Sequence, residues 1–163
     1  MIFLKPVLLS VVEFTEFGEV IALPQPPADH KKIQRWSSIS VPDVQNGKLI
    51  IDLLYSSERP LLVDTIELHN NSTQTFIPLD NHPFAVIVGS KEAVTEKGSI
   101  NVDRLFAFVS NGHQGITLKS DIWHCSPIPV GEAISFALMH RSPDVDLNIQ
   151  LAKFKESITL IIQ

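Results

Sequence analysis

The sequence has only one cysteine, Cys125, so no disulfide can form within the chain. A lone thiol is typical of proteins in reducing compartments, and we therefore expect a cytoplasmic protein. Positive charge is also scarce, because 13 Lys and Arg residues stand against 18 Asp and Glu residues and leave a net charge of −5. Without a basic cluster to neutralise phosphates, nucleic acid is excluded as the main partner.

Long hydrophobic runs are missing as well. The N-terminal stretch is apolar, but Lys5, Pro6 and Glu13 interrupt it. It has neither the unbroken core of a signal peptide nor the length of a membrane span, so we expect no membrane partner. The remaining composition, 44% hydrophobic and 19% charged, is ordinary for a soluble globular protein. Since no linker or repeat divides the chain, we expect a single domain over residues 1–163.

Short extended segments dominate the sequence. Ser10 and Glu13 have the spacing of a capping box and predict one short helix from about Val11 to Phe17. Turn residues separate the predicted strands at short intervals, which indicates an antiparallel β-sandwich or β-barrel. The predicted strands are Gln34–Ser40, Lys48–Tyr55, Leu61–His69, Thr75–Leu79, Phe84–Val88, Leu105–Val109, Gln114–Leu118, Ala133–His140, Asp146–Ala152 and Ser157–Ile162.

Two of these segments, Lys48–Leu54 and Ser157–Ile162, are apolar enough to need cover at a sheet edge. A symmetric homodimer is the commonest form of such cover, and we expect one here.

The stretch from Thr65 to Val88 organises the polar residues. Ile66 and Leu68 alternate with Glu67 and His69, and this period of two places Glu67 and His69 on one face of a strand. The turn formers Asn70, Asn71 and Ser72 follow, and then Gln74. His69 and Gln74 therefore lie on either side of a tight turn, from which both can point into one cavity.

Three of the histidines have a context that favours a site. His69, His124 and His140 each close or follow an apolar strand, where a barrel directs side chains into its mouth. The others, His30, His82 and His113, lie in polar segments or turns and are more typical of solvated residues.

Metal ligation is one interpretation of these histidines. A zinc or nickel site needs three or four convergent ligands, for which His69, Gln74 and His124 are candidates. The chain has no His-x-His pair, and the neutral Gln74 stands where a carboxylate would bind better. Cys125 adjoins His124, but neighbours on a strand point to opposite faces, so both could ligate only from a turn.

Other residues near the strand ends have alternative roles. Lys119 and Arg141 are cations suited to holding a small carboxylate, and surface ion pairing is the alternative for both. Trp123 either walls a pocket or fills the core. A nucleophilic pair of Cys125 and His124 is weaker, because nothing in the sequence orients it.

Three blocks of sequence resemble the ureidoglycolate lyase family. The first is Phe17-Gly18-Glu19-Val20-Ile21. The second is Ile66-Glu67-Leu68-His69 with Ser72-Thr73-Gln74-Thr75-Phe76-Ile77-Pro78-Leu79, similar to the family's Glu-Arg-His and Ser-Gln-x-Phe-Ile-Pro-Leu. The third is Gly115-Ile116-Thr117 with Ile122-Trp123-His124, similar to Gly-Val-x and Val-Trp-His. Their order and spacing agree over most of the chain.

This resemblance implies a cupin-like antiparallel β-barrel of the jelly-roll type, with a short N-terminal helix, usually assembled as a homodimer. It also implies a carbon–nitrogen lyase of the amidine-lyase type, which splits ureidoglycolate into glyoxylate and urea during purine (allantoin) breakdown. A divalent metal, nickel in particular, is associated with the family.

Several polar residues depart from the family pattern. Leu68 replaces an Arg, Cys125 replaces a His and His140 replaces an Asp. Asp121 ends a segment where the family tends to carry Tyr-His-Arg-Gly. Scaffold residues are better preserved than polar ones. That pattern suits a divergent lyase, or a non-catalytic cupin that binds a small carboxylate metabolite.

For the lyase, we expect His69, His124 and Lys119 as catalytic residues. Histidine suits proton transfer near neutral pH, and Lys119 or Arg141 would hold the substrate carboxylate. The expected substrate-binding residues are Gln74, Trp123, His140 and Arg141. A metal held by His69, Gln74 and His124 would instead polarise the substrate hydroxyl, and the sequence leaves both schemes open. A metal-dependent oxygenase is disfavoured, because the His-x-His pair and its carboxylate are missing.

Overall fold

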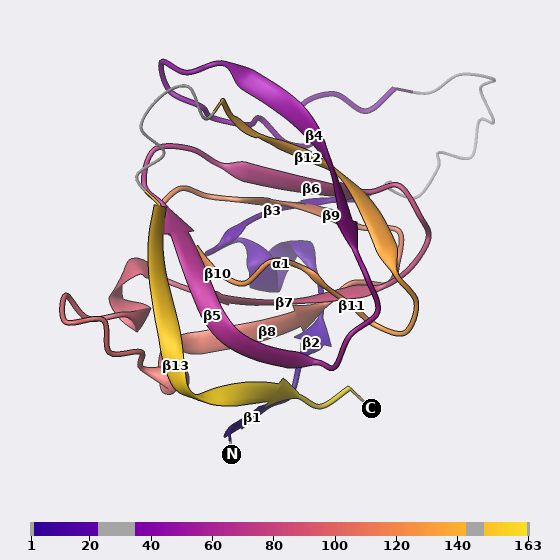
Figure 1. The fold of residues 1–163 in the computed structure, drawn as a ribbon. Coiled ribbons are helices and arrows are strands. Elements are labelled where there is room, and N and C mark those ends of the chain that lie inside the picture. Colours follow the sequence, from indigo (N-terminus) through magenta and orange to yellow (C-terminus); the bar gives the residue numbers. More distant parts are fainter. Residues whose placement is uncertain (1, 23–34, 143–148, 163) are drawn as a thin grey trace.

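The chain folds into two curled β-sheets that face each other, as the computed structural model of residues 2–22, 35–142 and 149–162 shows (Figure 1). Sheet A has the strand order β1-β13-β5-β10-β7-β8-β2, with β11 paired to β7, and sheet B has the order β3-β9-β6-β12-β4. The predicted all-β, cupin-like fold is confirmed. The elements are β1 (Ile2–Leu4), β2 (Val7–Leu8), α1 (Val11–Phe14), β3 (Gly18–Ile21), β4 (Leu49–Ser56), β5 (Leu62–His69), β6 (Gln74–Pro78), β7 (Phe84–Gly89), η1 (Lys91–Ala93), η2 (Val102–Arg104), β8 (Leu105–Val109), β9 (Gly115–Leu118), β10 (Trp123–His124), β11 (Ile128–Pro129), β12 (Ile134–Arg141) and β13 (Ile149–Leu160).

The side chain of Phe136 identifies the inward faces of the sheets. It is fully buried in β12, and its ring contacts Phe84 of β7 in the opposite sheet, with the ring centroids 5.3 Å apart. It also contacts Phe76 of β6 at 6.0 Å. Because side chains alternate along a strand, His140 shares the inward face of β12 with Phe136, and Gln74 shares that of β6 with Phe76. Both polar residues therefore point to the same side of sheet B.

The N-terminal helix α1 begins where the capping box predicts. Ser10 Oγ accepts a hydrogen bond from the Glu13 backbone N–H at 3.2 Å. The helix is shorter than predicted and ends at Phe14, because the Phe17 N–H bonds to the Phe14 carbonyl in a tighter turn. β3 then starts at Gly18, where an added Cβ would lie 1.9 Å from the Thr117 carbonyl oxygen. Only glycine allows this close pairing of β3 with β9.

One predicted strand, Gln34–Ser40, is wrong. Residue 34 lies outside the described residues, and residues 35–40 form no strand. Ser38 adopts a φ of 55°, which breaks an extended chain. Ser40 Oγ instead bonds to Thr117 Oγ1 of β9 at 2.7 Å. The segment therefore contacts sheet B through side chains, without joining its backbone ladder.

The two predicted C-terminal strands are one strand, β13, in which the register with β5 shifts between Lys153 and Ile158. Residues 146–148 of the first prediction lie outside the described residues. The sequence did not predict the short strands β1, β2, β3, β10 and β11. The pairs β1 with β13 and β2 with β8 are parallel, in contrast to the predicted antiparallel sheet. The remaining predicted strands agree with the observed ones to within one residue at each end.

No helix in the described ranges is long and apolar enough to cross a membrane.

Candidate active site

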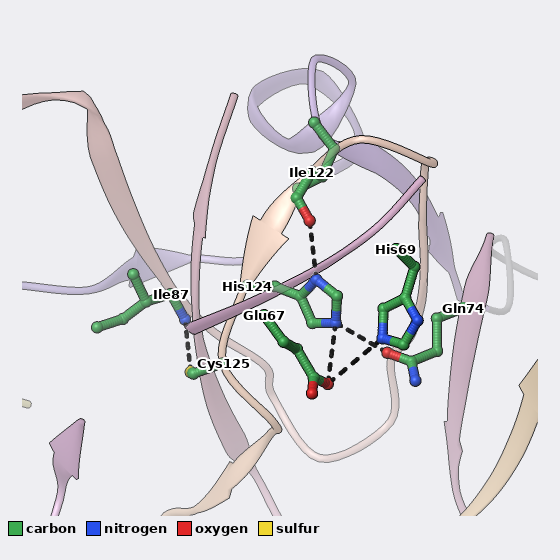
Figure 2. A network of polar contacts seen from close by, with 7 residues as sticks. All are labelled: Glu67, His69, Gln74, Ile87, Ile122, His124 and Cys125. Carbon is green, nitrogen blue, oxygen red and sulfur yellow. Dashed lines mark hydrogen bonds and ion pairs between the residues drawn. The ribbon is translucent and has the colours of Figure 1, made fainter. Parts of the chain in front are cut away.

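Four polar side chains converge between the sheets: Glu67 and His69 from β5, Gln74 from β6 and His124 from β10 (Figure 2). His124 Nε2 lies 2.8 Å from Gln74 Oε1 and 3.5 Å from Glu67 Oε1. The same Glu67 oxygen lies 3.6 Å from His69 Nε2. The two imidazole rings are stacked, with centroids 5.4 Å apart. We call these four residues the inner cluster.

Strand geometry brings the inner cluster together. Along β5, Ile66 and Leu68 are almost completely buried on one face, so Glu67 and His69 must point to the other. His124 pairs directly with Glu67 in the antiparallel register of β10 and β5, which puts their side chains on the same face. The sequence had placed Glu67 and His69 on one face, and the structure bears this out.

A turn before β10 helps to position His124. The Asp121 backbone N–H donates to the His69 carbonyl at 2.9 Å, which ties this turn to the end of β5. Asp121 adopts a φ of 63°, a left-handed conformation that glycine adopts most easily and aspartate tolerates. Asp121, one of the departures from the family pattern, therefore occupies a position with a left-handed backbone conformation.

His124 is held in one orientation. Its Nδ1 lies 2.9 Å from the Ile122 carbonyl oxygen, which can only accept, so Nδ1 carries a proton and donates. Nε2 is thereby directed at Glu67 and Gln74. The ring is 2% exposed, which shields these contacts from water.

The two histidines lower the pKa of Glu67 well below its ordinary value of 4.5, and the largest cause is the hydrogen bond with His124. The contact with His69 at 3.6 Å acts in the same direction, whereas burial opposes both. Glu67 is therefore an ionised carboxylate at neutral pH. It gives the inner cluster a fixed negative charge.

Three of these side chains fit a divalent metal. The ligand atoms of Glu67, His69 and His124 all lie within 4.8 Å of one another. His69 Nε2 is buried and has no hydrogen-bond partner among the described residues, as expected of a nitrogen whose partner is an ion. Two imidazoles and one carboxylate suit zinc, nickel and similar ions.

Sequence reasoning missed Glu67 as a member of this set. The predicted third ligand was Gln74, and no carboxylate was assigned to the metal site. The signal was present, because Glu67-x-His69 puts two ligands on one face of a strand just as a His-x-His pair does.

The predicted residues Lys119 and Trp123 are engaged elsewhere. Lys119 is exposed, and its Nζ donates to the backbone carbonyls of Thr15 at 2.6 Å and Glu16 at 3.3 Å. The Trp123 ring is buried, and its Nε1 donates to the Lys91 carbonyl at 3.2 Å. Trp123 thus packs in the core next to η1.

His140 and Arg141 point to opposite sides of sheet B. His140 lies on the inward face, and its Nε2 is 2.8 Å from Asp52 Oδ2 of β4. Arg141, its neighbour on β12, faces outward. The Arg141 side chain packs against Gly47, where an added Cβ would lie 2.5 Å from its Nε.

Cys125 points away from the inner cluster. Its buried Sγ accepts a hydrogen bond from the Ile87 N–H at 3.2 Å, and burial raises the pKa of the thiol to about 11. The thiol is therefore protonated at neutral pH and is a poor metal ligand or nucleophile.

We predict that the Glu67 carboxyl remains ionised at about pH 4, because its folded-state pKa lies below the ordinary range. The interaction with the histidines then stabilises the fold fully above the ordinary glutamate pKa. This stabilisation is lost as the pH falls through the folded-state pKa. Carbon-13 NMR of the glutamate carboxyls during an acid titration measures the midpoint.

His124→Ala should raise the pKa of Glu67, because it removes the largest cause of the lowering. His82→Ala is the control, since His82 contacts the exposed Glu132. An ordinary Glu67 midpoint in the unmodified protein would contradict the proposed electrostatics.

Residues 1–161 match the family described as ureidoglycolate lyase. The ureidoglycolate lyase of Burkholderia mallei (strain NCTC 10229) is 28% identical over 159 residues, which cover 93% of this chain and 89% of the relative. That of Pseudomonas syringae pv. syringae (strain B728a) is 29% identical over 163 residues, covering 94% and 91%. Among solved structures, a dTDP sugar isomerase from Desulfovibrio desulfuricans G20 superposes with a TM-score of 0.47 at 11% identity, covering 85% of this chain and 83% of that one. Because the family match spans nearly the whole sequence, this chain belongs to the ureidoglycolate lyase family.

Proposed function

We propose that this protein cleaves ureidoglycolate into glyoxylate and urea. The observation that carries the proposal is the inner cluster of Glu67, His69, Gln74 and His124 in a chain of the ureidoglycolate lyase family. The cluster combines an ionised carboxylate with two imidazoles and an amide in a largely buried setting. Groups of this kind can move protons and bind a small polar molecule.

The reaction breaks the bond between the hydroxyl-bearing carbon and the ureido nitrogen. The hydroxyl loses its proton and becomes the aldehyde oxygen of glyoxylate, while the electron pair of the broken bond goes to nitrogen. That nitrogen takes up a proton, and urea leaves. His69 and His124 are the groups we propose for these two proton transfers, and Gln74 for a hydrogen bond to the urea carbonyl or the hydroxyl.

A divalent cation would be held by Glu67, His69 and His124, with Gln74 beside them. When bound, it would supply Lewis-acid polarisation of a substrate oxygen. A nitrogen that binds a cation cannot carry a proton at the same time, so the two uses of the histidines exclude each other. Proton transfer in the metal-loaded protein would then fall to other groups, and His140 with Asp52 lies on the inward face next to β6.

The predicted roles of Lys119, Trp123 and Arg141 remain predictions. In the described part of the chain, no side-chain hydrogen bond or ion pair joins these residues to the inner cluster. Supporting observations favour His140 among the predicted substrate-binding residues, because it faces inward beside the strand that carries Gln74.

We predict that His124→Ala lowers turnover by roughly 10²–10⁴-fold while the protein stays folded, because the variant removes a proton-transfer group or a metal ligand. The assay couples released glyoxylate to a reductase and follows the reduced nicotinamide cofactor. It is run with and without added nickel.

His113→Ala is the matched control, since His113 is exposed in a turn and should retain full activity. If the unmodified protein releases no glyoxylate above the spontaneous rate, the lyase proposal fails. Equal activity in His124→Ala, His69→Ala and the unmodified protein would remove these histidines from the mechanism.

We predict that the protein binds one nickel ion per chain and that Glu67→Gln and His69→Ala each weaken this binding at least roughly tenfold. Affinity should fall as the pH is lowered, because imidazoles must give up protons to ligate. Titration calorimetry of the metal-free protein measures both effects without using activity. Glu132→Gln, at an exposed carboxylate, serves as the control. Unchanged binding in both cluster variants would place the metal elsewhere.

We also propose that the protein is a cytoplasmic homodimer. The edge strand β4 supports the dimer, because Leu49, Ile51, Leu53 and Tyr55 are exposed at alternate positions on one face. The cytoplasm is supported by Cys125, which is a free, buried thiol.

We predict a dimer in sedimentation equilibrium at micromolar concentration, and we predict that Leu53→Lys shifts it toward monomer by placing a charge in the contact. Leu8→Lys, at a comparably exposed leucine of sheet A, should leave the dimer intact. A monomeric unmodified protein would contradict the proposal.

A further inference from the structure

A groove runs beside the inner cluster, along one side of β5. β10 pairs with both β5 and β7, whereas β11 pairs with β7. Between them the chain leaves β5, and the Cys125 N–H bonds to Ile87 of β7. Pro127 and Pro129 lack the N–H groups that a renewed ladder with β5 would need. The gap that this leaves in the sheet is the groove.

The groove consists of two adjoining cavities. One, of about 130 Å³, is lined by Glu67 and His124 of the inner cluster. The other, of about 180 Å³, is lined by Arg59. Both share Thr65, Cys125 and Ser126 as walls, so the groove leads from the inner cluster to Arg59.

The groove has a length that suits a small substrate. Thr65, which lines both cavities, is two residues from Glu67 along β5, and this corresponds to roughly 7 Å. In ureidoglycolate the carboxylate is bonded directly to the reacting carbon, so this carbon would lie in the shared part of the groove. Its hydroxyl and ureido groups would then point toward the inner cluster, and its carboxylate toward the cavity that Arg59 lines.

Arg59 has hydrogen-bonding capacity left for such a ligand. Its Nη2 donates to the Pro127 carbonyl at 3.5 Å, a long contact that uses one of five N–H groups. Asp64 also lines this cavity, yet within the described residues no ion pair joins it or any other carboxylate to Arg59. An unpaired guanidinium at the end of a groove is suited to a bidentate carboxylate contact.

The other candidate cations are less well placed. The Lys119 ammonium is bound to the carbonyls of Thr15 and Glu16. Arg141 faces the outside of sheet B, as described above. Arg59 therefore offers the carboxylate-holding charge that the sequence had assigned to those two residues.

We propose that Arg59 binds the carboxylate of the substrate and thereby fixes which end of the molecule lies away from the inner cluster. This inference rests on the proposed lyase function and adds a binding residue to it. The class of ligand is a small 2-hydroxy or 2-oxo carboxylate, with ureidoglycolate and glyoxylate as its members in the reaction.

The test compares Arg59→Ala with the unmodified protein in the glyoxylate-release assay, using the two products as separate inhibitors. Glyoxylate carries the carboxylate, whereas urea does not. We expect Arg59→Ala to raise the KM for ureidoglycolate and the inhibition constant of glyoxylate by roughly 10- to 100-fold, the loss typical of one charge-assisted contact. Inhibition by urea should be unchanged, and Arg59→Lys should lie in between.

Arg104→Ala is the matched control, because Arg104 is exposed in η2, outside the groove. Unchanged glyoxylate inhibition in Arg59→Ala would overturn the proposal. So would an equal loss of glyoxylate and urea inhibition, since this would mean that Arg59 acts on the whole site. Circular dichroism of each variant verifies folding.

A second measurement keeps this inference separate from the proposed activity. Glyoxylate binding to the same variants is measured by titration calorimetry, which needs no turnover. If the unmodified protein is inactive but binds glyoxylate, a 10- to 100-fold weaker binding in Arg59→Ala still supports the role of Arg59. Equal binding in both proteins, or no glyoxylate binding by the unmodified protein at millimolar concentration, overturns it.

Discussion

The candidate site depends on the alternation of side chains along β5. Ile66 and Leu68 are buried on one face of this strand, and this burial forces Glu67 and His69 onto the other. Shifting the register by one residue would bury two polar side chains in place of two apolar ones, so hydrophobic packing fixes the register strongly. The site is therefore positioned by residues that take no part in its chemistry.

The charge of Glu67 determines the chemical character of the inner cluster. Contacts with His124 and His69 keep its carboxyl ionised, although burial acts against the charge. The carboxylate and the two imidazoles can share protons or hold a cation, and the shielded position of His124 strengthens either interaction. The proposed lyase needs both proton movement and polarisation of an oxygen, and this set of groups can supply them.

The site has a second part, which lies where the sheet is incomplete. The chain after His124 leaves β5 and pairs with β7, and the resulting groove connects the inner cluster with Arg59. In this interpretation, reacting groups come from strands, whose geometry is rigid. The charge that orients the substrate comes from the connection after β4.

Local sequence patterns predicted much of the fold. The strand Leu105–Val109 was predicted at its observed boundaries, and the Ser10 cap was recognised from its spacing to Glu13. The predicted strand at Gln34–Ser40 failed because Ser38 has a φ of 55°, which breaks an extended chain, and Ser40 bonds to Thr117 of sheet B through its side chain. The short strands β10 and β11 escaped prediction, since two residues are too few to show a period of two.

The sequence by itself determined which side chains share a face of a strand, because that relation depends only on the alternation of neighbouring residues. Glu67 with His69 is such a case. Only the tertiary structure decided which strands meet and in what register. It brought His124 next to Glu67, left Lys119 bound to backbone carbonyls, and opened a groove toward Arg59. These outcomes depend on contacts between residues far apart in the chain, and local spacing carries no information about them.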